Sequence, residues 1–257
     1  MKVYFKHYTG AITAYDYLFF DCMAEVSLEE EDQALEEGWL PDDYVIKRDS
    51  EYGISKSHWY QARQTRIDLS KFCDNAKTRQ LRNRCSEIST KIFNCKDVDM
   101  DSLRVIFSKY LNYKDFKYWD LDKVIISEPE RKHFLIYYYL GKPVAFTFLR
   151  DVGTASVYSV QFAWDYEEPK LYLGKYANLA EIDYCIDNNK THMYIGLGYE
   201  NACRYKADYK GFEFWNGELW SSNKKKYKEL CKRDSNIKLL SDLEKCKDYD
   251  DEHVFKK

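Results

Sequence analysis

The sequence has little proline, no long apolar run and no closely spaced cysteine pair, and each shortage excludes a class of protein. Its 257 residues include 4 prolines and 45% apolar residues, which argues against a disordered chain and provides ample material for a packed core. No stretch approaches the roughly 18 consecutive apolar residues of a membrane span, because Gly141, Lys142 and Pro143 interrupt the longest candidate. The first ten residues lack the apolar segment of a secretory signal. We therefore expect a compact, soluble, cytoplasmic protein without a membrane partner.

The cysteines are scattered rather than arranged for disulfides or zinc. No two stand at C-x-x-C spacing, and a chain of this size does not depend on disulfides for folding. We therefore predict free thiols in a reducing compartment and no metal site. The eight residues are Cys22, Cys73, Cys85, Cys95, Cys185, Cys203, Cys231 and Cys246.

Charge is nearly balanced in total but unevenly distributed. The formal net charge is -3, residues 25–51 are acidic, and residues 63–91 are basic. A basic strip on a mildly acidic body is typical of a polyanion-binding surface, and a merely solvated face is the plainer alternative. The cations of the strip are Arg63, Arg66, Lys71, Lys77, Arg79, Arg82, Arg84 and Lys91.

Local signals predict the elements of the N-terminal third. Ser27 followed by Glu30 fits a capping box, so a helix begins at Ser27 and Gly38 ends it. Residues 59–69 alternate as one strand. Apolar positions are sparse over residues 75–94, and we interpret that segment as a turn followed by a basic strip.

The rest of the chain changes from helix to strands. Apolar residues at helical spacing predict a helix over residues 102–118. Three strands that follow form an antiparallel meander, with a helix and one more strand after them. Those strands cover residues 133–140, 144–151 and 155–164, the helix covers 173–189, and the last strand covers 192–197.

This order of elements is that of the core of the GNAT-type acyltransferases. In that core the phosphates of a carrier meet the N-terminus of the helix after the third strand, where backbone N–H groups and the helix dipole favour an anion. The turn at residues 171–176 lies at the matching place. We expect an α+β fold with a GNAT-like core, a mostly antiparallel sheet flanked by helices and a smaller N-terminal α/β region. The predicted domains are residues 1–95 with the basic strip, 96–220 as the acyltransferase core, and 221–257 as a charged tail.

Several segments, in order, resemble the arginyl-tRNA-protein transferase family, including its bacterial leucyl branch. Leu35–Trp39 is similar to the family's helix ending in a Gly-Trp turn. Arg66–Phe72 followed by Lys77–Asn83 resembles its strand and its basic Ser-Gln-Arg-Arg signature. The resemblance spans about residues 25–215.

Two further motifs lie in the C-terminal half. Tyr172–Ala177 resembles the family's Ser-Leu-Gly-Thr-Tyr turn. His192–Tyr199 and Arg204–Ala207 resemble its Tyr-Tyr-Leu-Gly-Tyr strand and Met-Arg-Tyr-Lys-Ala motif, with Cys203 in place of the usual methionine. One departure is the absence of the family's N-terminal cysteine pairs, which speaks against metal-dependent or redox regulation.

The resemblance implies an aminoacyltransferase that moves an amino acid, arginine above others, from aminoacyl-tRNA to the N-terminal amine of a protein or peptide. The ester is already activated, so alignment of the reactants alone supplies about 7–11 kcal/mol in favourable cases. A base and an oxyanion donor add to this. Aminoacyl-tRNA is then a co-substrate, no cofactor is required, and a monomer is expected.

The tRNA is expected to meet basic residues, because arginine and lysine bind phosphates and the interaction weakens steeply with salt. Lys77, Arg79, Arg82 and Arg84 are predicted to contact the phosphates of the acceptor stem. The set comprises Arg63, Lys77, Arg79, Arg82 and Arg84, the turn residues Gly174 and Lys175, and, nearer the terminal nucleotides, Arg204 and Lys206.

Catalysis and aminoacyl recognition require a base, carboxylates and aromatic surfaces. Asp165, just past the third strand, is the predicted base, and Tyr199 completes the catalytic pair. Tyrosines are expected to stack on exposed bases, although most of the 24 tyrosines serve packing. The predicted aminoacyl pocket consists of Tyr176, Glu181, Glu200 and Tyr205.

Two other functions remain open. An acyl-CoA-dependent GNAT N-acetyltransferase needs a second small residue in its phosphate turn, which the sequence after Gly174 lacks. The other is a non-catalytic relative that binds RNA or a protein partner. Turnover distinguishes that relative, because it retains tRNA without consuming the ester.

Overall fold

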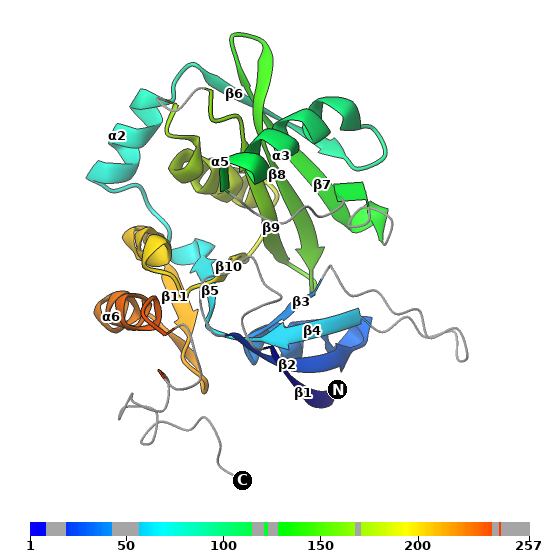
Figure 1. The fold of residues 1–257 in the computed structure, drawn as a ribbon, viewed down its shortest axis with the longest axis vertical. Helices are drawn as coiled ribbons and strands as arrows, with labels where there is room; N and C mark the ends of the chain where they lie inside the picture. Colours follow the sequence, from blue (N-terminus) through cyan, green and yellow to red (C-terminus); the bar gives the residue numbers. More distant parts are fainter. Residues whose placement is uncertain are drawn as a thin grey trace. The chain divides into compact units, whose positions relative to one another are not determined.

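The computed structural model describes residues 1–8, 19–42, 57–114, 121–122, 128–167, 171–237 and 242 (Figure 1). The chain forms two compact units. Unit 1 comprises Met1–Thr65, Leu197–Asp208 and Phe212–Lys257, and unit 2 comprises Arg66–Gly196 and Tyr209–Gly211. The predicted domain boundaries near residues 95 and 220 remain predictions.

Unit 1 contains a four-stranded antiparallel sheet in the order β1-β2-β4-β3. The N–H and Oγ of Ser27 both donate to Glu30 Oε2 at 3.1 Å, so the predicted capping box and its helix are confirmed. The strands are β1 (Lys2–Tyr8), β2 (Phe19–Val26), β3 (Trp39–Pro41) and β4 (Ser57–Gln61), and between β2 and β3 lie η1 (Leu28–Glu30) and α1 (Glu31–Glu36).

The C-terminal part of unit 1 packs around one tyrosine. Tyr227 is fully buried, with ring centroids 4.7 Å from Phe212 and 5.4 Å from Phe214. Its hydroxyl donates to the Cys203 carbonyl at 3.1 Å. The elements are η5 (Asn201–Asp208), the antiparallel pair β11 (Phe212–Trp215) and β12 (Trp220–Ser221), and α6 (Lys224–Asp234), a helix that the sequence did not predict.

Unit 2 is organised on a sheet whose strands run β5-β10-β9-β8-β7-β6. The pairs β6–β7, β7–β8 and β8–β9 are antiparallel, and β10 pairs with β9 in parallel. The predicted meander is thereby confirmed. The strands are β5 (Gln64–Asp68), which begins in unit 1, β6 (Ile88–Asn94), β7 (Lys132–Tyr139), β8 (Lys142–Val152), β9 (Ser156–Trp164) and β10 (His192–Leu197).

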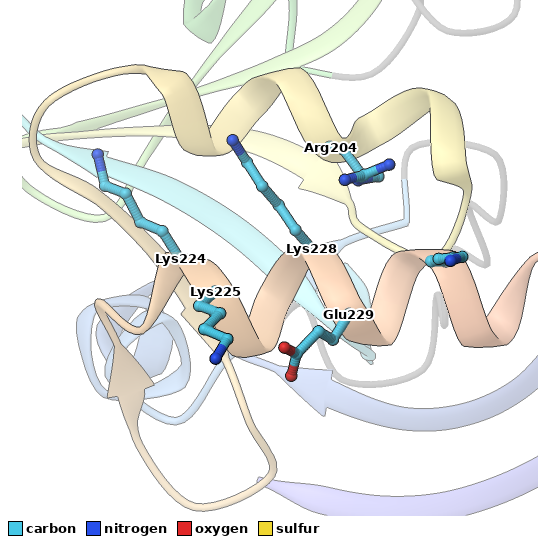
Figure 2. A pocket seen from close by; sticks show the side chains of 6 residues that line it. Arg204, Lys224, Lys225, Lys228 and Glu229 are labelled. Carbon is cyan, nitrogen blue, oxygen red and sulfur yellow. The ribbon is translucent and has the colours of Figure 1, made fainter.

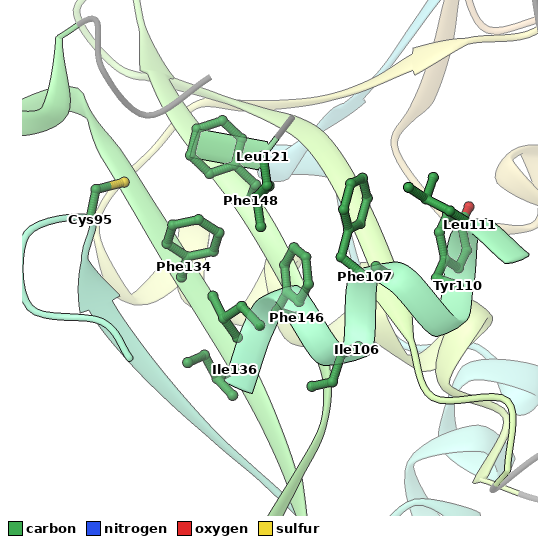
Figure 3. Packing of buried hydrophobic residues seen from close by; sticks show 12 residues of the cluster. Cys95, Ile106, Phe107, Tyr110, Leu111, Leu121, Phe134, Ile136, Phe146 and Phe148 are labelled. Atoms are coloured by element: carbon green, nitrogen blue, oxygen red, sulfur yellow. The ribbon is translucent and has the colours of Figure 1, made fainter. Parts of the chain in front are cut away.

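Two long helices cover this sheet: α3 (Met100–Lys114) and α5 (Leu173–Asp187). Alternate residues of a strand point to opposite faces. Phe146 and Phe148 of β8 pack in the same apolar cluster as Phe107 of α3 (Figure 3). Thr147, between them, bonds to Glu181 of α5. The two helices therefore lie on opposite faces, and the expected α+β core with a mostly antiparallel sheet between helices is confirmed.

The buried residues of α3 are the five that its apolar spacing predicts: Leu103, Ile106, Phe107, Tyr110 and Leu111. Residues 115–118 of the predicted helix lie outside the described residues. Within the described ranges, no helix combines the length and the apolarity required to cross a bilayer.

The segment expected as a turn and a basic strip is a helix, α2 (Ala76–Arg84), followed by β6. The Asn75 side chain accepts hydrogen bonds from the N–H groups of Lys77 and Thr78 at 2.9 and 3.1 Å. Only Thr78 of this helix is buried, so no apolar stripe reveals it in the sequence. The cap Asn75 was the available signal.

The single strand expected over residues 59–69 is in fact two strands, β4 and β5. The Gln64 N–H donates to the Ala62 carbonyl at 2.7 Å, which closes a tight turn between them. Such a turn ends one strand and redirects the chain. After β5 come the short helix η2 (Leu69–Lys71) and α2, and η3 (Pro129–Arg131) precedes β7.

Leu103→Ala should lower the free energy of unfolding by about 2–5 kcal/mol, because it opens a cavity in a closed apolar cluster. Leu103 is 0% exposed on α3, whereas Val105 on the same helix is 58% exposed. Val105→Ala should change stability by less than about 0.5 kcal/mol. Urea unfolding followed by circular dichroism measures both; equal midpoints for the two variants would contradict this packing.

Candidate functional site

The first turn of α5 lies beside a tryptophan of β9. Tyr172, which precedes the helix, has a left-handed backbone (φ 52°), and its carbonyl accepts from the N–H groups of Lys175 and Tyr176 at 3.1 and 3.2 Å. A Cβ on Gly174 would lie 3.5 Å from the Trp164 ring. The Tyr209 hydroxyl donates to the Lys175 carbonyl at 2.9 Å and fixes the turn. The predicted residues Gly174 and Lys175 thus lie where a helix N-terminus favours an anion.

An aromatic cluster surrounds that tryptophan. The Trp164 centroid lies 5.1 Å from Phe162, 4.5 Å from Tyr166 and 5.2 Å from Tyr110 of α3. Tyr113 stacks on Tyr166 and is 64% exposed. Exposed aromatic rings of this kind provide stacking surfaces for unpaired bases. Sequence reasoning missed this cluster, because its members are indistinguishable from packing aromatics until α3 and β9 are brought together.

The strands β9 and β10 pair over only part of their length. Their ladder joins three residue pairs, ending at Tyr158 and Tyr194, although β9 continues to Trp164. The register of β9 against β8 also shifts between Ser159 and Gln161, so Val160 is an extra, bulged residue. Bulges commonly lie next to active sites. The edge of β9 past Tyr158 is therefore a stretch of backbone outside the β10 ladder.

A buried polar network joins the sheet to α5. Thr147 Oγ1 donates to Glu181 at 2.7 Å, and Asn178 Nδ2 donates to the other carboxylate oxygen at 3.2 Å. The Tyr137 hydroxyl lies 3.0 Å from Thr147 Oγ1 and donates to the Ala177 carbonyl. Burial, followed by the charge of Glu181, raises the pKa of Tyr137 well above its ordinary value. Glu181 is fully buried, and its predicted role in an aminoacyl pocket remains a prediction.

Asp165 forms an ion pair at the end of β9. Its carboxylate accepts from Lys109 Nζ at 2.8 Å and from the Glu167 N–H at 3.0 Å. Partial burial opposes its ionisation, but the hydrogen bonds from Lys109 and Glu167 outweigh burial and lower the pKa of Asp165. Lys109 also contacts the exposed Glu167 carboxylate at 3.0 Å. The Asp165 carboxylate is ionised, which is the protonation state that a general base requires. Its lowered pKa, however, makes it a weaker base.

The predicted basic strip divides between an anchor and an exposed surface on α2. Arg82 Nε contacts Asp74, and its two terminal nitrogens donate to Asp183 of α5, so this side chain ties α2 to α5. Lys77, Arg79 and Arg84 are exposed. The Arg84 guanidinium lies 5.2 Å from the centre of the Tyr172 ring, which places the end of α2 beside the start of α5.

Tyr199, the predicted catalytic tyrosine, contacts Arg63 within unit 1. The Arg63 N–H donates to the Tyr199 hydroxyl at 2.9 Å, and its guanidinium lies 4.9 Å from the centre of that ring. The same guanidinium bonds to the buried Asp234 of α6. Lys206 is buried and donates to the Leu197 carbonyl at 2.7 Å. These interactions give Arg63 and Lys206 structural roles within unit 1. Their predicted contacts with tRNA remain predictions.

The other predicted residues of unit 1 lie on or near η5. Arg204 is exposed and donates to Asn201 Oδ1 at 3.3 Å, whereas Glu200 and Tyr205 are half-buried. The predicted site is thus distributed over both units. Unit 2 holds Lys77, Arg79, Arg82, Arg84, Asp165, Gly174, Lys175, Tyr176 and Glu181, and unit 1 holds Arg63, Tyr199, Glu200, Arg204, Tyr205 and Lys206.

The buried thiols offer little nucleophilic character. Burial raises the pKa of Cys85 and Cys231 to about 11 and that of Cys95 to about 12, and it also raises the pKa of Cys185. Cys73 is exposed. Across the described ranges, no three His, Cys, Asp or Glu side chains gather as metal ligands, and the expected absence of a metal remains a prediction.

The meander, α5 and β10 fall within one segment that is similar to a known family. Residues 95–216 match the family described as arginine-tRNA-protein transferase, C terminus. The predicted family resemblance is confirmed over this segment. The α2 and α6 helices lie outside the matched residues. No curated protein matches the chain.

Solved structures share parts of the fold at low identity. The C-terminal domain of a putative lysylphosphatidylglycerol synthetase from Agrobacterium fabrum has 15% identity and a TM-score of 0.44, over 53% of this chain and 46% of that one. L-PGS from Bacillus licheniformis has 12% identity and a TM-score of 0.45, over 68% of this chain and 53% of that one. FemX has 10% identity and a TM-score of 0.40, over 75% of this chain and 57% of that one. This chain spans about half the length of the structures it matches, and none of these likenesses decides its activity.

Brief treatment with iodoacetamide at pH 8 should alkylate Cys73 in the native protein and leave Cys95, Cys185 and Cys231 unlabelled until denaturation. A thiol with a pKa of about 12 is ionised to roughly one part in ten thousand at that pH, and burial also blocks the reagent. Peptide mapping by mass spectrometry measures each site. Labelling of Cys95 or Cys231 as fast as Cys73 would show that these thiols are accessible.

Proposed function

We propose that this protein transfers an amino acid from aminoacyl-tRNA to an amine, that the amino acid is arginine, and that the acceptor is the N-terminal amine of a protein or peptide. The family match over residues 95–216 carries the proposal, because it covers the meander, α5 and β10. The choice of arginine and of a protein acceptor rests on that family description alone.

The geometry of unit 2 supports binding of the tRNA end. The first turn of α5 suits a phosphate, and Arg84, an exposed cation of α2, lies beside it through its contact with Tyr172. The aromatic cluster around Trp164 borders the same turn, since Gly174 packs against that ring. A phosphate, its flanking phosphates and an unstacked base thus have adjacent surfaces on one unit.

The reaction requires few groups from the protein. The amine nitrogen attacks the ester carbonyl, a C–N bond forms, and the C–O bond to the tRNA ribose breaks. The proton lost by the amine goes to a base, and the departing ribose oxygen takes up a proton. Asp165, at the end of β9 and close to the backbone edge past Tyr158, is the proposed base.

The purified protein should transfer radiolabelled arginine from a pool of charged tRNAs to a peptide with an N-terminal Asp or Glu. Lys77→Gln with Arg79→Gln should lower kcat/KM about tenfold at low tRNA concentration, because both residues are exposed cations of α2. Counting label in the peptide measures this. Arg82 is excluded from the variant, because its loss leaves Asp74 and Asp183 without their shared cation.

The control for this assay is Lys96→Gln with Lys142→Gln, which removes the same charge from exposed positions outside α2. Its kcat/KM should stay within about twofold of wild type. No label in any of a varied set of peptides, with turnover of acetyl-CoA instead, would replace the proposal by an N-acetyltransferase. Retention of tRNA without turnover of either donor would replace it by a binding protein.

Asp165→Asn should lower kcat by about 10²–10⁴-fold, the usual contribution of a general base. Glu167→Gln is the matched control, because Glu167 contacts the same Lys109 but is 75% exposed, and it should change kcat by less than about twofold. Initial rates between pH 5 and 9 measure both. Equal rates in the two variants at every pH would remove Asp165 from the catalytic groups and leave the transfer reaction itself in place.

A further inference from the structure

A basic groove lies in unit 1, between α6 and η5. Its volume is about 430 Å³, and its lining contains five cationic side chains and one carboxylate. Figure 2 shows Lys224 and Lys228 extending from α6 toward the side of η5 that carries Arg204. We call this surface the α6 groove. Its lining residues are Arg204, Lys224, Lys225, Lys228, Glu229 and Lys232.

The helix that forms the groove is held firmly from behind. Its inner face consists of Tyr227, Cys231 and Asp234, spaced so that they point the same way, and all three are buried. Tyr227 donates to the Cys203 carbonyl of η5 at 3.1 Å, and Cys231 Sγ donates to the Gly198 carbonyl at 3.0 Å. The lysines on the outer face are therefore presented by a fixed scaffold rather than by a loose tail.

The charges of α6 oppose one another in the absence of an anion. Lys224, Lys228 and Lys232 are four residues apart, so like charges are neighbours on one stripe of the helix, which destabilises it. The first turn has no acidic residue, although the helix dipole favours negative charge there. Asp208 offsets part of this through its 2.7 Å contact with Lys228. A bound polyanion would relieve the remaining repulsion.

The lining favours a phosphate backbone over a membrane or an acidic peptide. A helix that lies in a membrane surface needs exposed apolar side chains on its other face, but that face of α6 is buried against unit 1. Peptide recognition usually depends on a buried aromatic or aliphatic anchor, and every residue that lines the groove is charged. Repeated positive charge is instead how proteins bind nucleic-acid backbones without reading sequence.

We infer that the α6 groove binds the phosphate backbone of the tRNA substrate as a second contact, separate from the surface of α2 and formed mainly by α6, which lies outside the matched family segment. This inference rests on the proposed function for the identity of the RNA. The contact adds affinity without sequence preference.

The test is binding of uncharged mixed tRNA to the full chain, measured by filter retention between about 50 and 300 mM KCl. Lys225→Gln with Lys232→Gln removes two exposed charges of the groove. This variant should weaken binding at least about fivefold at low salt and reduce the slope of log K against log salt by about two. Lys96→Gln with Lys142→Gln, the control of equal charge, should leave both unchanged.

Equal affinity and slope for wild type and the groove variant would overturn the inference, and the transfer assay then judges the proposed function separately. Loss of binding to phosphatidylglycerol vesicles with unchanged tRNA binding would overturn it in favour of a lipid surface. Failure of the wild type to retain tRNA would overturn it as well; only the additional absence of aminoacyl transfer would remove the proposed function. Matching thermal unfolding of both variants excludes misfolding as the cause of a loss.

Discussion

Burial of both faces of the β7–β8–β9 meander is the constraint on which unit 2 depends. One face is closed by α3 through an aromatic cluster that includes Phe107, Phe146 and Phe148. The other face carries Thr147, which meets α5 through the buried carboxylate of Glu181. A buried carboxylate is tolerated only with hydrogen-bond donors, so the position of α5 on the sheet is specified by this polar contact as well as by apolar packing.

The position of α5 in turn determines what surrounds its first turn. Gly174 packs against Trp164, and Asp183, about two and a half helical turns further on, receives the guanidinium of Arg82. The basic helix α2 is thereby attached to the same helix that offers its N-terminus to an anion. Because a bidentate arginine–carboxylate pair has fixed geometry, the exposed cations of α2 are held in place and lose little freedom when a phosphate binds.

The sequence allowed much of the core of unit 2 to be predicted, because α3 has a clear apolar period and turn residues bound the strands. The five buried positions of α3 follow from spacing 3.6, and the three strands of the meander are β-favouring runs separated by glycine turns. The helices α2 and α6 were missed for the opposite reason: α2 buries only Thr78, and α6 buries a short stripe within a charged run. The aromatic cluster and the unpaired edge of β9 depend on contacts between elements, which no local pattern contains.

Local charge density, rather than the sum over the chain, governs how this protein meets a polyanion. The net charge of -3 alone would indicate repulsion. At physiological ionic strength, however, charges interact only within about 8–10 Å, so a bound phosphate senses the side chains around it and little else. The α6 groove gathers five cations within one surface of unit 1, and α2 presents its own cations on unit 2. A mildly acidic chain thus retains two strongly basic surfaces, while its carboxylates lower non-specific attraction elsewhere.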